Sequence, residues 1–307
     1  MTILVTGATG FVGLGLIHHL HGLGRGVVGF ADREAPMGWW PKGVPLTLGD
    51  IRDGVALSRV MADHGVTSVV HGAAITAGPE IERLTPERVI AVNVEGTAAL
   101  MRAASERGVA RVVHASSGSV YPLTKPAAGT FDALRDPPAP TSLYGISKLS
   151  AELVAIRLSA VYGLTVPVLR LSAVYGAYER DTGVREILSV PAQIMACLAR
   201  GEEVCLSRPG AGAWLSVRDA AAGLAALLNA PLTGAPVFDL AGPEVFTMAD
   251  LCAALAQRQP AFRWSLDPDH PTVAYQLPRD RAPSDTTRLT ATTGFAPRFG
   301  LNEGLDD

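Results

Sequence analysis

Short apolar runs that alternate with helical stretches constrain the fold of this chain more than any other feature. Consecutive apolar residues are typical of strands buried on both faces, and such strands occur in parallel sheets covered by helices on each side. The pattern therefore predicts an α/β fold with a doubly wound parallel sheet. The runs comprise Ile3–Val5, Val27–Phe30, Ser68–His71, Arg111–His114, Val166–Leu171 and Val237–Leu240.

The first run is followed by a glycine-rich stretch, TGATGFVG, at residues 6–13. Glycines spaced in this way between a strand and a helix allow a tight turn, close approach of the backbone to a pyrophosphate, and close packing of helix on strand. A purely structural turn is the alternative, but the position within a βαβ unit predicts a dinucleotide site of the Rossmann type. The loop residues assigned to the cofactor are Gly7, Thr9, Gly10, Phe11, Val12 and Gly13.

Asp32, at the end of the second predicted strand, bears on which dinucleotide binds. A carboxylate at this distance from the glycine loop accepts hydrogen bonds from both ribose hydroxyls of NAD and repels the 2′-phosphate of NADP. Arg33 beside it could attract that phosphate. The pair favours NAD and leaves NADP possible.

Composition and charge narrow the classes of partner. The chain has 307 residues, of which 48% are hydrophobic and 18% charged, with a net charge of -3 and a pI near 6.2. No Lys- or Arg-rich stripe is present to attract nucleic acid or an anionic membrane, and no apolar run reaches the about 18 residues that span a bilayer. A small-molecule substrate is therefore expected.

Cysteine and histidine positions predict neither disulfides nor a metal site. Cys197, Cys205 and Cys252 are far apart and lack metal-ligand spacing, which indicates buried free thiols. The histidines at positions 18, 19 and 21 cluster on one predicted helix, but no carboxylate or Cys completes a ligand set. The N-terminus also lacks the charged segment of a signal peptide, so a cytoplasmic location is expected.

Domain boundaries follow from where the apolar runs occur. We expect a dinucleotide-binding domain at residues 1–172, with return segments near 214–242. The Pro- and Gly-punctuated segments 173–213 and 243–307 would form a smaller, discontinuous substrate-binding lobe.

Six motifs in this order and spacing resemble one family. They are GATGFVG, GDIRD at 49–53, VVHGAA at 69–74, NVEGT at 93–97, SSGSVY at 116–121 and YGISK at 144–148. Over nearly its whole length the chain resembles the extended short-chain dehydrogenase/reductases of the epimerase/dehydratase type. The resemblance implies an NAD(P)-dependent dehydrogenase or epimerase that forms a homodimer through two helices near residues 89–104 and 149–161.

The resemblance also implies roles for individual residues. Asp50 and Ile51 match the pair beside the adenine ring, and Ala73 and Ala74 the backbone along the phosphates. Asn93 matches a member of the cofactor site that organises the surroundings of the catalytic lysine. The catalytic positions of the family correspond to Ser117, Tyr144 and Lys148.

Tyr144 and Lys148 are four residues apart, so on a helix they share one face. An unassisted tyrosine is too weak an acid to act as a base at neutral pH. A nearby ammonium and the positive nicotinamide favour its phenolate form. Tyr144 would then take the substrate hydroxyl proton while Ser117 hydrogen-bonds the same oxygen. An isolated Y-x-x-x-K pair is more often an exposed helical pair, but here it follows the other motifs.

Departures from the family pattern bear on the substrate. Dehydratases carry an acidic pair where this chain has Gly118 and Ser119, which disfavours dehydration. Nucleotide-sugar epimerases usually carry an Asn at the position of Ala173 and an Arg near that of Gly212, so two anchors for a sugar nucleotide are absent. These departures predict an oxidoreductase that takes hydride from a small sugar, polyol or hydroxy acid. A nucleotide-sugar epimerase and a non-catalytic dinucleotide sensor are the alternatives.

Candidate substrate contacts follow from the same alignment. Arg180 and Arg185 could bind a carboxylate or a phosphate, although pairing with neighbouring acidic residues, such as Glu179, is as plausible. The full set of candidates is Thr76, Ser119, Ser172, Arg180 and Arg185.

Overall fold

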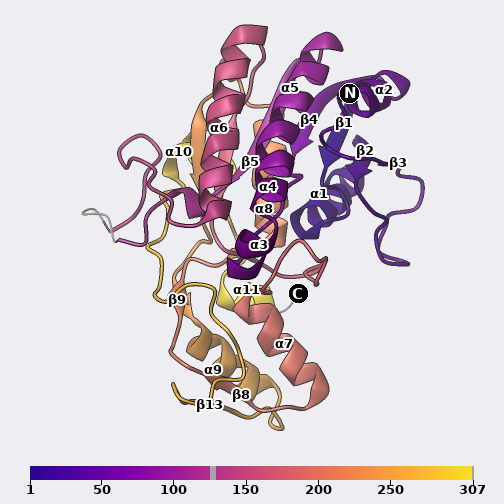
Figure 1. Ribbon diagram of the computed structural model, residues 1–307. Coiled ribbons are helices and arrows are strands. Elements are labelled where there is room, and N and C mark those ends of the chain that lie inside the picture. Colours follow the sequence, from indigo (N-terminus) through magenta and orange to yellow (C-terminus); the bar gives the residue numbers. More distant parts are fainter. Residues whose placement is uncertain (125–128, 306–307) are drawn as a thin grey trace.

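A computed structural model of the chain describes residues 1–124 and 129–305. Its centre is a seven-stranded sheet in the order β11-β6-β5-β4-β1-β2-β3, and every neighbouring pair is parallel (Figure 1). The prediction of a doubly wound parallel sheet is confirmed. The strands are β1 (Thr2–Thr6), β2 (Gly26–Ala31), β3 (Leu46–Leu48), β4 (Val66–His71), β5 (Arg111–Ser117), β6 (Val168–Leu171) and β11 (Val237–Leu240).

Helices cover both faces of this sheet. Two separate apolar clusters lie between the helices and the strands, because the apolar residues of each strand point alternately to opposite faces. On one face the helices are α1 (Phe11–Gly22), α8 (Val217–Leu227) and α10 (Thr287–Thr293). On the other they are α2 (Gly54–Asp63), α5 (Gly96–Glu106) and α6 (Leu143–Tyr162).

The chain order reverses between β1 and β4. From β1 the sheet extends through β2 to β3, whereas on the other side β4 continues to β5 and β6. At such a switch point the loops that leave the two strands diverge, and a crevice opens at the carboxyl edge of the sheet. The glycine loop after β1 and the Gly72–Ala74 segment after β4 therefore lie on either side of one crevice.

A smaller lobe lies below the carboxyl edge of the sheet in Figure 1. It has its own apolar cluster, in which residues of α7, β8 and α9 pack together. A short parallel pair, β8 with β13, flanks these helices. The elements of this lobe are α7 (Val190–Arg200), β8 (Val204–Leu206), α9 (Met248–Arg258), β13 (Trp264–Leu266) and α11 (Leu301–Leu305).

The segments of the smaller lobe are not consecutive in the chain, which returns to the sheet between them. After β8, helix α8 packs against α1, and β11 then pairs with β6 before the chain re-enters the lobe. The connecting elements are α3 (Pro79–Leu84), α4 (Pro86–Ile90), the π-helical turn η1 (Ala91–Glu95), the 3-10 turn η2 (Gly118–Val120), β7 (Val174–Tyr175), β9 (Ala211–Gly212), β10 (Leu215–Ser216) and β12 (Phe246–Thr247).

In the part of the chain that the structure describes, no helix combines the length and apolarity needed to cross a bilayer. The three cysteines are buried free thiols. Within the same residues, no group of three or more His, Cys, Asp or Glu side chains could hold a metal ion.

Candidate active site

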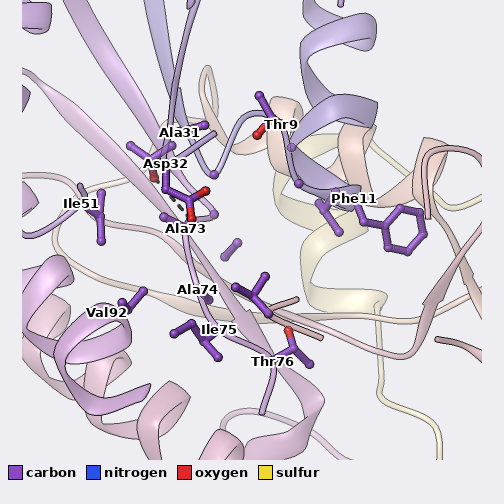
Figure 2. Close-up of a pocket in the computed structure, with 18 of the residues that line it drawn as sticks. Thr9, Phe11, Ala31, Asp32, Ile51, Ala73, Ala74, Ile75, Thr76 and Val92 are labelled. Carbon is purple, nitrogen blue, oxygen red and sulfur yellow. Dashed lines mark hydrogen bonds between the residues drawn. The ribbon is translucent and has the colours of Figure 1, made fainter. Parts of the chain in front are cut away.

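A cavity of about 290 Å³ lies in the crevice at the switch point. Figure 2 shows Thr9 of the glycine loop, Asp32 after β2 and Thr76 after β4 around this space. The sequence-predicted cofactor residues that line it are Gly7, Thr9, Gly10, Phe11, Val12, Gly13, Asp32, Arg33, Asp50, Ile51, Ala73, Ala74, Tyr144 and Lys148.

Gly7 is required by the geometry of the glycine loop. Its φ of +67° lies in the left-handed region, which side chains other than glycine rarely adopt. A Cβ added here would also lie 2.8 Å from the Cα and the backbone N of Ala73. The loop can therefore approach the segment after β4 closely, and it directs the N-terminus of α1 at the cavity, as phosphate binding requires.

Asp32 and Arg33 form an ion pair in the wall of this cavity, next to the glycine loop. Two nitrogens of Arg33 donate to the two carboxylate oxygens of Asp32, at 2.7 and 3.1 Å. This pairing raises the pKa of Arg33. Arg33 Nη1 also donates to the carbonyl oxygen of Thr182. Because the guanidinium is already engaged, a 2′-phosphate would have to displace these contacts, which favours NAD over NADP.

Residues 178–186 form a strap that bridges the two sides of the cofactor cavity. On one side, Arg180 Nη2 donates to the carbonyl oxygen of Thr9 at 2.8 Å. On the other, the backbone N of Thr76 donates to the carbonyl oxygen of Val184 at 2.8 Å. Glu186 accepts hydrogen bonds from the first backbone N–H groups of α3. The strap is therefore fastened at both ends and contributes to the cavity wall.

A second cavity, of about 300 Å³, lies between the sheet and the smaller lobe. Tyr144 lines both cavities, whereas Lys148 lines the first and Ser117 the second. A cofactor in the first cavity and a substrate in the second would therefore meet at Tyr144. Four of the predicted substrate residues line the second cavity, namely Thr76, Ser119, Ser172 and Arg185.

Helix α6 begins at a position that brings Tyr144 next to the end of β5. Ser142 caps the helix, because its side chain accepts a hydrogen bond from the backbone N of Gly145 at 3.1 Å. A Cβ on Gly145 would lie 2.4 Å from the carbonyl oxygen of Ser119, so only glycine permits this approach. The first turn of α6 can then pack directly against the SSGSVY segment.

Lys148 is 5% exposed and donates from Nζ to the carbonyl oxygen of Ala115 at 2.5 Å. Burial lowers the pKa of its ammonium to about 8, against an opposing effect of the Glu152 carboxylate one turn further along α6. Burial and the charge of Lys148 also lower the pKa of His71, to about 3. Neutral His71 therefore adds no second positive charge near the ammonium.

Ser117 Oγ accepts a hydrogen bond from the backbone N of Ser119 at 3.1 Å. A serine hydroxyl has two acceptor lone pairs and one hydrogen, so this bond leaves the hydrogen available. At the edge of the second cavity it can donate to a substrate oxygen that also reaches Tyr144.

A buried charged network lies behind the catalytic face, and the sequence motifs gave no indication of it. Arg170 of β6 forms a bidentate pair with Glu152 at 2.5 and 3.1 Å. Arg170 Nη1 donates at 2.8 Å to the hydroxyl of Tyr121, which in turn donates to Asp239 of β11 at 3.0 Å. Because Ser116 also donates to Glu152, the network connects three strands to α6.

The structure places two of the predicted site residues outside the cavity expected for them. Arg180, predicted in the substrate pocket, lines the cofactor cavity instead, where its guanidinium lies 5.4 Å from the ring centroid of Trp39. Asn93, predicted as part of the cofactor site, is buried and lines neither cavity. It bonds both backbone groups of Ile75 and the hydroxyl of Ser147, and so it supports the lysine-bearing helix from behind.

Arg185 forms an ion pair with an acidic neighbour, which was the alternative to a substrate contact. Its Nη2 lies 3.1 Å from Glu179, while its side chain still lines both cavities.

Sequence reasoning missed three further arginines of the substrate cavity. Arg208, Arg279 and Arg281 line it beside Gly212 and Ala173, the positions where family anchors are absent. The cavity therefore does have cations, although they arise from other segments. Their position depends on how the smaller lobe packs against the sheet. No local sequence motif predicts this packing.

Carboxylates are scarce in this cavity. Among its described lining residues Asp280 is the one acid, and it accepts hydrogen bonds from Arg208 and from the backbone N of Ala211. It is therefore engaged, and the described residues offer no free acid to remove a carbon-bound proton.

Comparison with known proteins identifies the family and similar structures. A sequence model described as the NAD dependent epimerase/dehydratase family matches residues 3–241. The dTDP-glucose 4,6-dehydratase of Streptomyces antibioticus is 30% identical over 320 residues, which cover 99% of this chain and 90% of that protein. The UDP-glucose 4-epimerase of Azospirillum brasilense is 34% identical over 180 residues, or 57% of this chain and 49% of that protein.

Among solved structures, MoeE5 in complex with UDP-glucuronic acid and NAD superposes with a TM-score of 0.78 at 27% identity. The match covers 100% of this chain and 97% of that one. The predictions of an enzyme of the extended short-chain dehydrogenase type and of NAD as its cofactor are confirmed. The chain belongs to the NAD dependent epimerase/dehydratase family.

Proposed function

We propose that the protein is an NAD-dependent epimerase of a nucleotide sugar, which oxidises one hydroxyl carbon and reduces it again with inverted configuration. The comparisons favour this alternative over the dehydrogenase that the sequence first suggested, because the similar proteins act on or bind nucleotide sugars. The absence of the Asn and Arg anchors is compatible with a nucleotide-sugar substrate, since Arg208, Arg279 and Arg281 bring positive charge to the same cavity.

The cofactor cavity fits NAD. Its glycine loop approaches the opposite wall so closely that a Cβ on Gly7 would clash, and the Asp32 carboxylate lies where ribose hydroxyls would donate. Bound NAD would accept a hydride from the substrate carbon and later return it.

This chain supplies the proton chemistry around that transfer. Tyr144, as the phenolate, takes the hydroxyl proton as the C–H bond breaks, and gives it back when the carbonyl is reduced. Lys148, held at the carbonyl oxygen of Ala115, stabilises the phenolate and can reach the nicotinamide ribose. Ser117 donates to the reacting oxygen and keeps it beside Tyr144 in both half-reactions. Inversion requires the sugar ring to turn over in the second cavity between the two transfers.

The strap over the cofactor cavity is the observation that carries this proposal. A dehydrogenase must exchange its cofactor in every cycle, whereas an epimerase regenerates NAD in place. Contacts of the strap with Thr9, Arg33, Thr76 and the N-terminus of α3 would all have to break before NAD could leave through this side. A retained cofactor suits an epimerase.

Dehydration is a less suitable reaction, despite the similarity to dTDP-glucose 4,6-dehydratases. Loss of water from a keto sugar needs an acid and a base beside the reacting carbons. The described lining residues of the substrate cavity include no carboxylate other than Asp280, which is paired with Arg208.

A dehydrogenase of a small sugar, polyol or hydroxy acid is the second candidate. The observation in its favour is that Ala173 and Gly212 line the cavity where family members carry anchors. A dehydrogenase would be recognised by the stoichiometric accumulation of NADH.

One experiment separates the two. Purified protein is incubated with UDP- and dTDP-hexoses, and in parallel with free sugars and hydroxy acids plus added NAD. Epimers are resolved by chromatography while absorbance is followed at 340 nm. The proposal predicts epimers without net NADH. NADH that rises with a small substrate, with no epimer formed, would replace it with the dehydrogenase.

We further propose that the protein is a cytoplasmic homodimer. Each chain would be divided into the two lobes with the boundaries expected from the sequence. On α6, Leu153 and Val161 are 57% and 53% exposed, which supports pairing through the α5–α6 face. Sedimentation of the wild type and of Leu153→Glu tests the dimer, because a monomeric wild type would exclude it.

A further inference from the structure

Arg281 has an unusual position that the reaction described so far does not use. Its Nη1 donates to the carbonyl oxygen of Gly118, the residue that follows Ser117. It lies close enough to Tyr144 for the two side chains to interact electrostatically. The guanidinium therefore stands at the reacting end of the substrate cavity.

The segment that carries Arg281 is fixed by backbone contacts. Phe131 donates from its backbone N to the carbonyl oxygen of Pro283 at 2.8 Å. Asp285 donates in turn to the carbonyl oxygen of Phe131 at 2.7 Å. Arg281 is thus presented from a braced segment, and its position does not depend on a bound substrate.

Arg281 is half-buried, and among the described residues it has no counter-charge. Its Nε is buried and has no hydrogen-bond partner among the described residues, and no carboxylate in that part of the chain pairs with it. Burial lowers the pKa of its guanidinium. A half-buried cation without a counter-charge and a buried, unsatisfied N–H are costly, so such a group is expected to receive an anion from a ligand.

The location indicates which part of a substrate supplies that anion. Arg208, by contrast, pairs with Asp280 and lies 4.1 Å from the ring centroid of Tyr275, in the part of the cavity formed by the smaller lobe. A diphosphate linker would suit that end. An anion beside Gly118 must be bonded close to the reacting carbon that lies between Ser117 and Tyr144.

In a hexose that reacts at C4, the neighbouring carbons are C3 and C5. C3 carries a neutral hydroxyl, whereas the C6 substituent on C5 can be oxidised to a carboxylate. A guanidinium binds a carboxylate through two parallel N–H···O bonds, and Nη1 is the one nitrogen of the Arg281 side chain that has a hydrogen-bond partner among the described residues.

We propose that Arg281 is a specificity-determining residue that binds the C6 carboxylate of a nucleotide uronate, so that the substrate is a uronic acid sugar nucleotide. This inference rests on the proposed epimerase function. The similarity to a protein solved with UDP-glucuronic acid is consistent with a carboxylate being accommodated by this fold, although it assigns no role to Arg281.

The test compares UDP-glucuronate with UDP-glucose, which share the nucleotide and differ at C6. The unmodified protein is expected to epimerise the uronate with at least about 10-fold higher kcat/KM. Arg281→Gln should lower kcat/KM for the uronate about 100-fold and change that for UDP-glucose less than about 3-fold, because a charge-assisted contact is lost with one substrate alone. Arg281→Lys, which keeps the charge without the planar fork, should fall between them.

Arg59→Gln on α2 is the matched control, since Arg59 is 82% exposed and pairs with Asp63 away from both cavities. It should leave both rates unchanged.

An equal loss with both substrates in Arg281→Gln would overturn the inference and would mean that the arginine acts on Tyr144. A wild type that prefers UDP-glucose would also overturn it, even if the variant failed to fold. If no nucleotide sugar is epimerised, the proposed function fails instead. Calorimetry with UDP-glucuronate then still tests Arg281: the inference predicts about 100-fold weaker binding by Arg281→Gln, and equal affinity would refute it.

Discussion

At the scale of single residues, the position of Tyr144 in the walls of both cavities decides what its hydroxyl can do. It can exchange a proton with a substrate oxygen while the cofactor lies on its other side. Lys148 and Ser117 each belong to one cavity, so the two supporting roles are separated in space as the reaction needs.

Tyr144→Phe removes the proton-transferring oxygen and keeps the ring. We expect kcat to fall by about 10² to 10⁴, the range typical of general acid–base groups, with NAD still bound. Epimer formation and the NAD content of denatured protein measure the two quantities. A variant that retained full turnover would exclude Tyr144 as the base, and one that lost NAD would show that the hydroxyl mainly holds the cofactor.

Residue positions set by local spacing could be predicted from the sequence. The glycine loop and the Tyr144–Lys148 pair each depend on one turn of chain, so their geometry follows from spacing alone. Arg180 and Arg281 could not be placed in this way. Each is carried by a loop whose course depends on contacts with distant segments, as with Thr9 for Arg180 and Phe131 for the Arg281 segment.

At the scale of elements, α6 combines the reactive pair with a buried acid. Tyr144, Lys148 and Glu152 recur every four residues, so all three lie on one face of the helix. Glu152 also pairs with Arg170 of β6, which ties the orientation of α6 to the sheet. The sequence predicted this helix and the first two roles. The network behind it was missed because its partners come from β5, β6 and β11.

The buried ammonium gives the pH profile an alkaline limit. Since the pKa of Lys148 is lowered to about 8, raising the pH through 8 removes the charge that supports the phenolate, and kcat/KM should fall. The Glu152 carboxylate raises this pKa, so Glu152→Gln should move the alkaline limb to lower pH. Glu106→Gln, an exposed change on α5, should leave it in place. If the alkaline fall of kcat/KM in Glu152→Gln occurs at the same pH as in the wild type or at a higher pH, the assignment of this limb to Lys148 is contradicted.

Glu152→Gln should also lower stability by about 3–5 kcal/mol, because one partner of a buried ion pair is lost. Circular dichroism and thermal melting therefore accompany the pH profile, so that a shift in the limb is read from folded protein alone.

Asp239 of β11 couples stability to pH. Burial raises the pKa of its carboxyl to about 7, against opposing effects of Arg170 and of the Tyr121 hydrogen bond. A group whose folded pKa lies above its unfolded value binds more protons in the folded state, so its contribution is present at low pH and is lost as the pH rises towards 7. The loss is on the order of 4 kcal/mol.

Asp239→Asn lacks this titration. The melting temperature of the wild type relative to the variant should therefore decrease from pH 5 to pH 8. A constant difference would mean that Asp239 is ionised throughout.

At the scale of the whole molecule, two lobes enclose one reacting point. The sheet provides the cofactor crevice at its switch point, and residues of the smaller lobe line the substrate cavity. The smaller lobe lies below the sheet in Figure 1. Buried strands and glycine turns are local signals, so the sequence gives an expected division, and its boundaries stay a prediction. The sequence did not predict the strap, because residues 178–186 contain no periodic pattern and are positioned by contacts with the glycine loop, Arg33 and α3.

The strap makes the central claim testable in one reaction. If NAD is retained and takes and returns the same hydride, a nucleotide sugar deuterated at the reacting carbon should give an epimer that keeps its deuterium, even with excess unlabelled NAD and NADH in solution. Mass spectrometry of the product measures the label. Retention in nearly all product molecules is the predicted result. Loss of the label to the free cofactor, or its appearance in NADH without an epimer, would contradict the account and indicate a dehydrogenase that exchanges its cofactor.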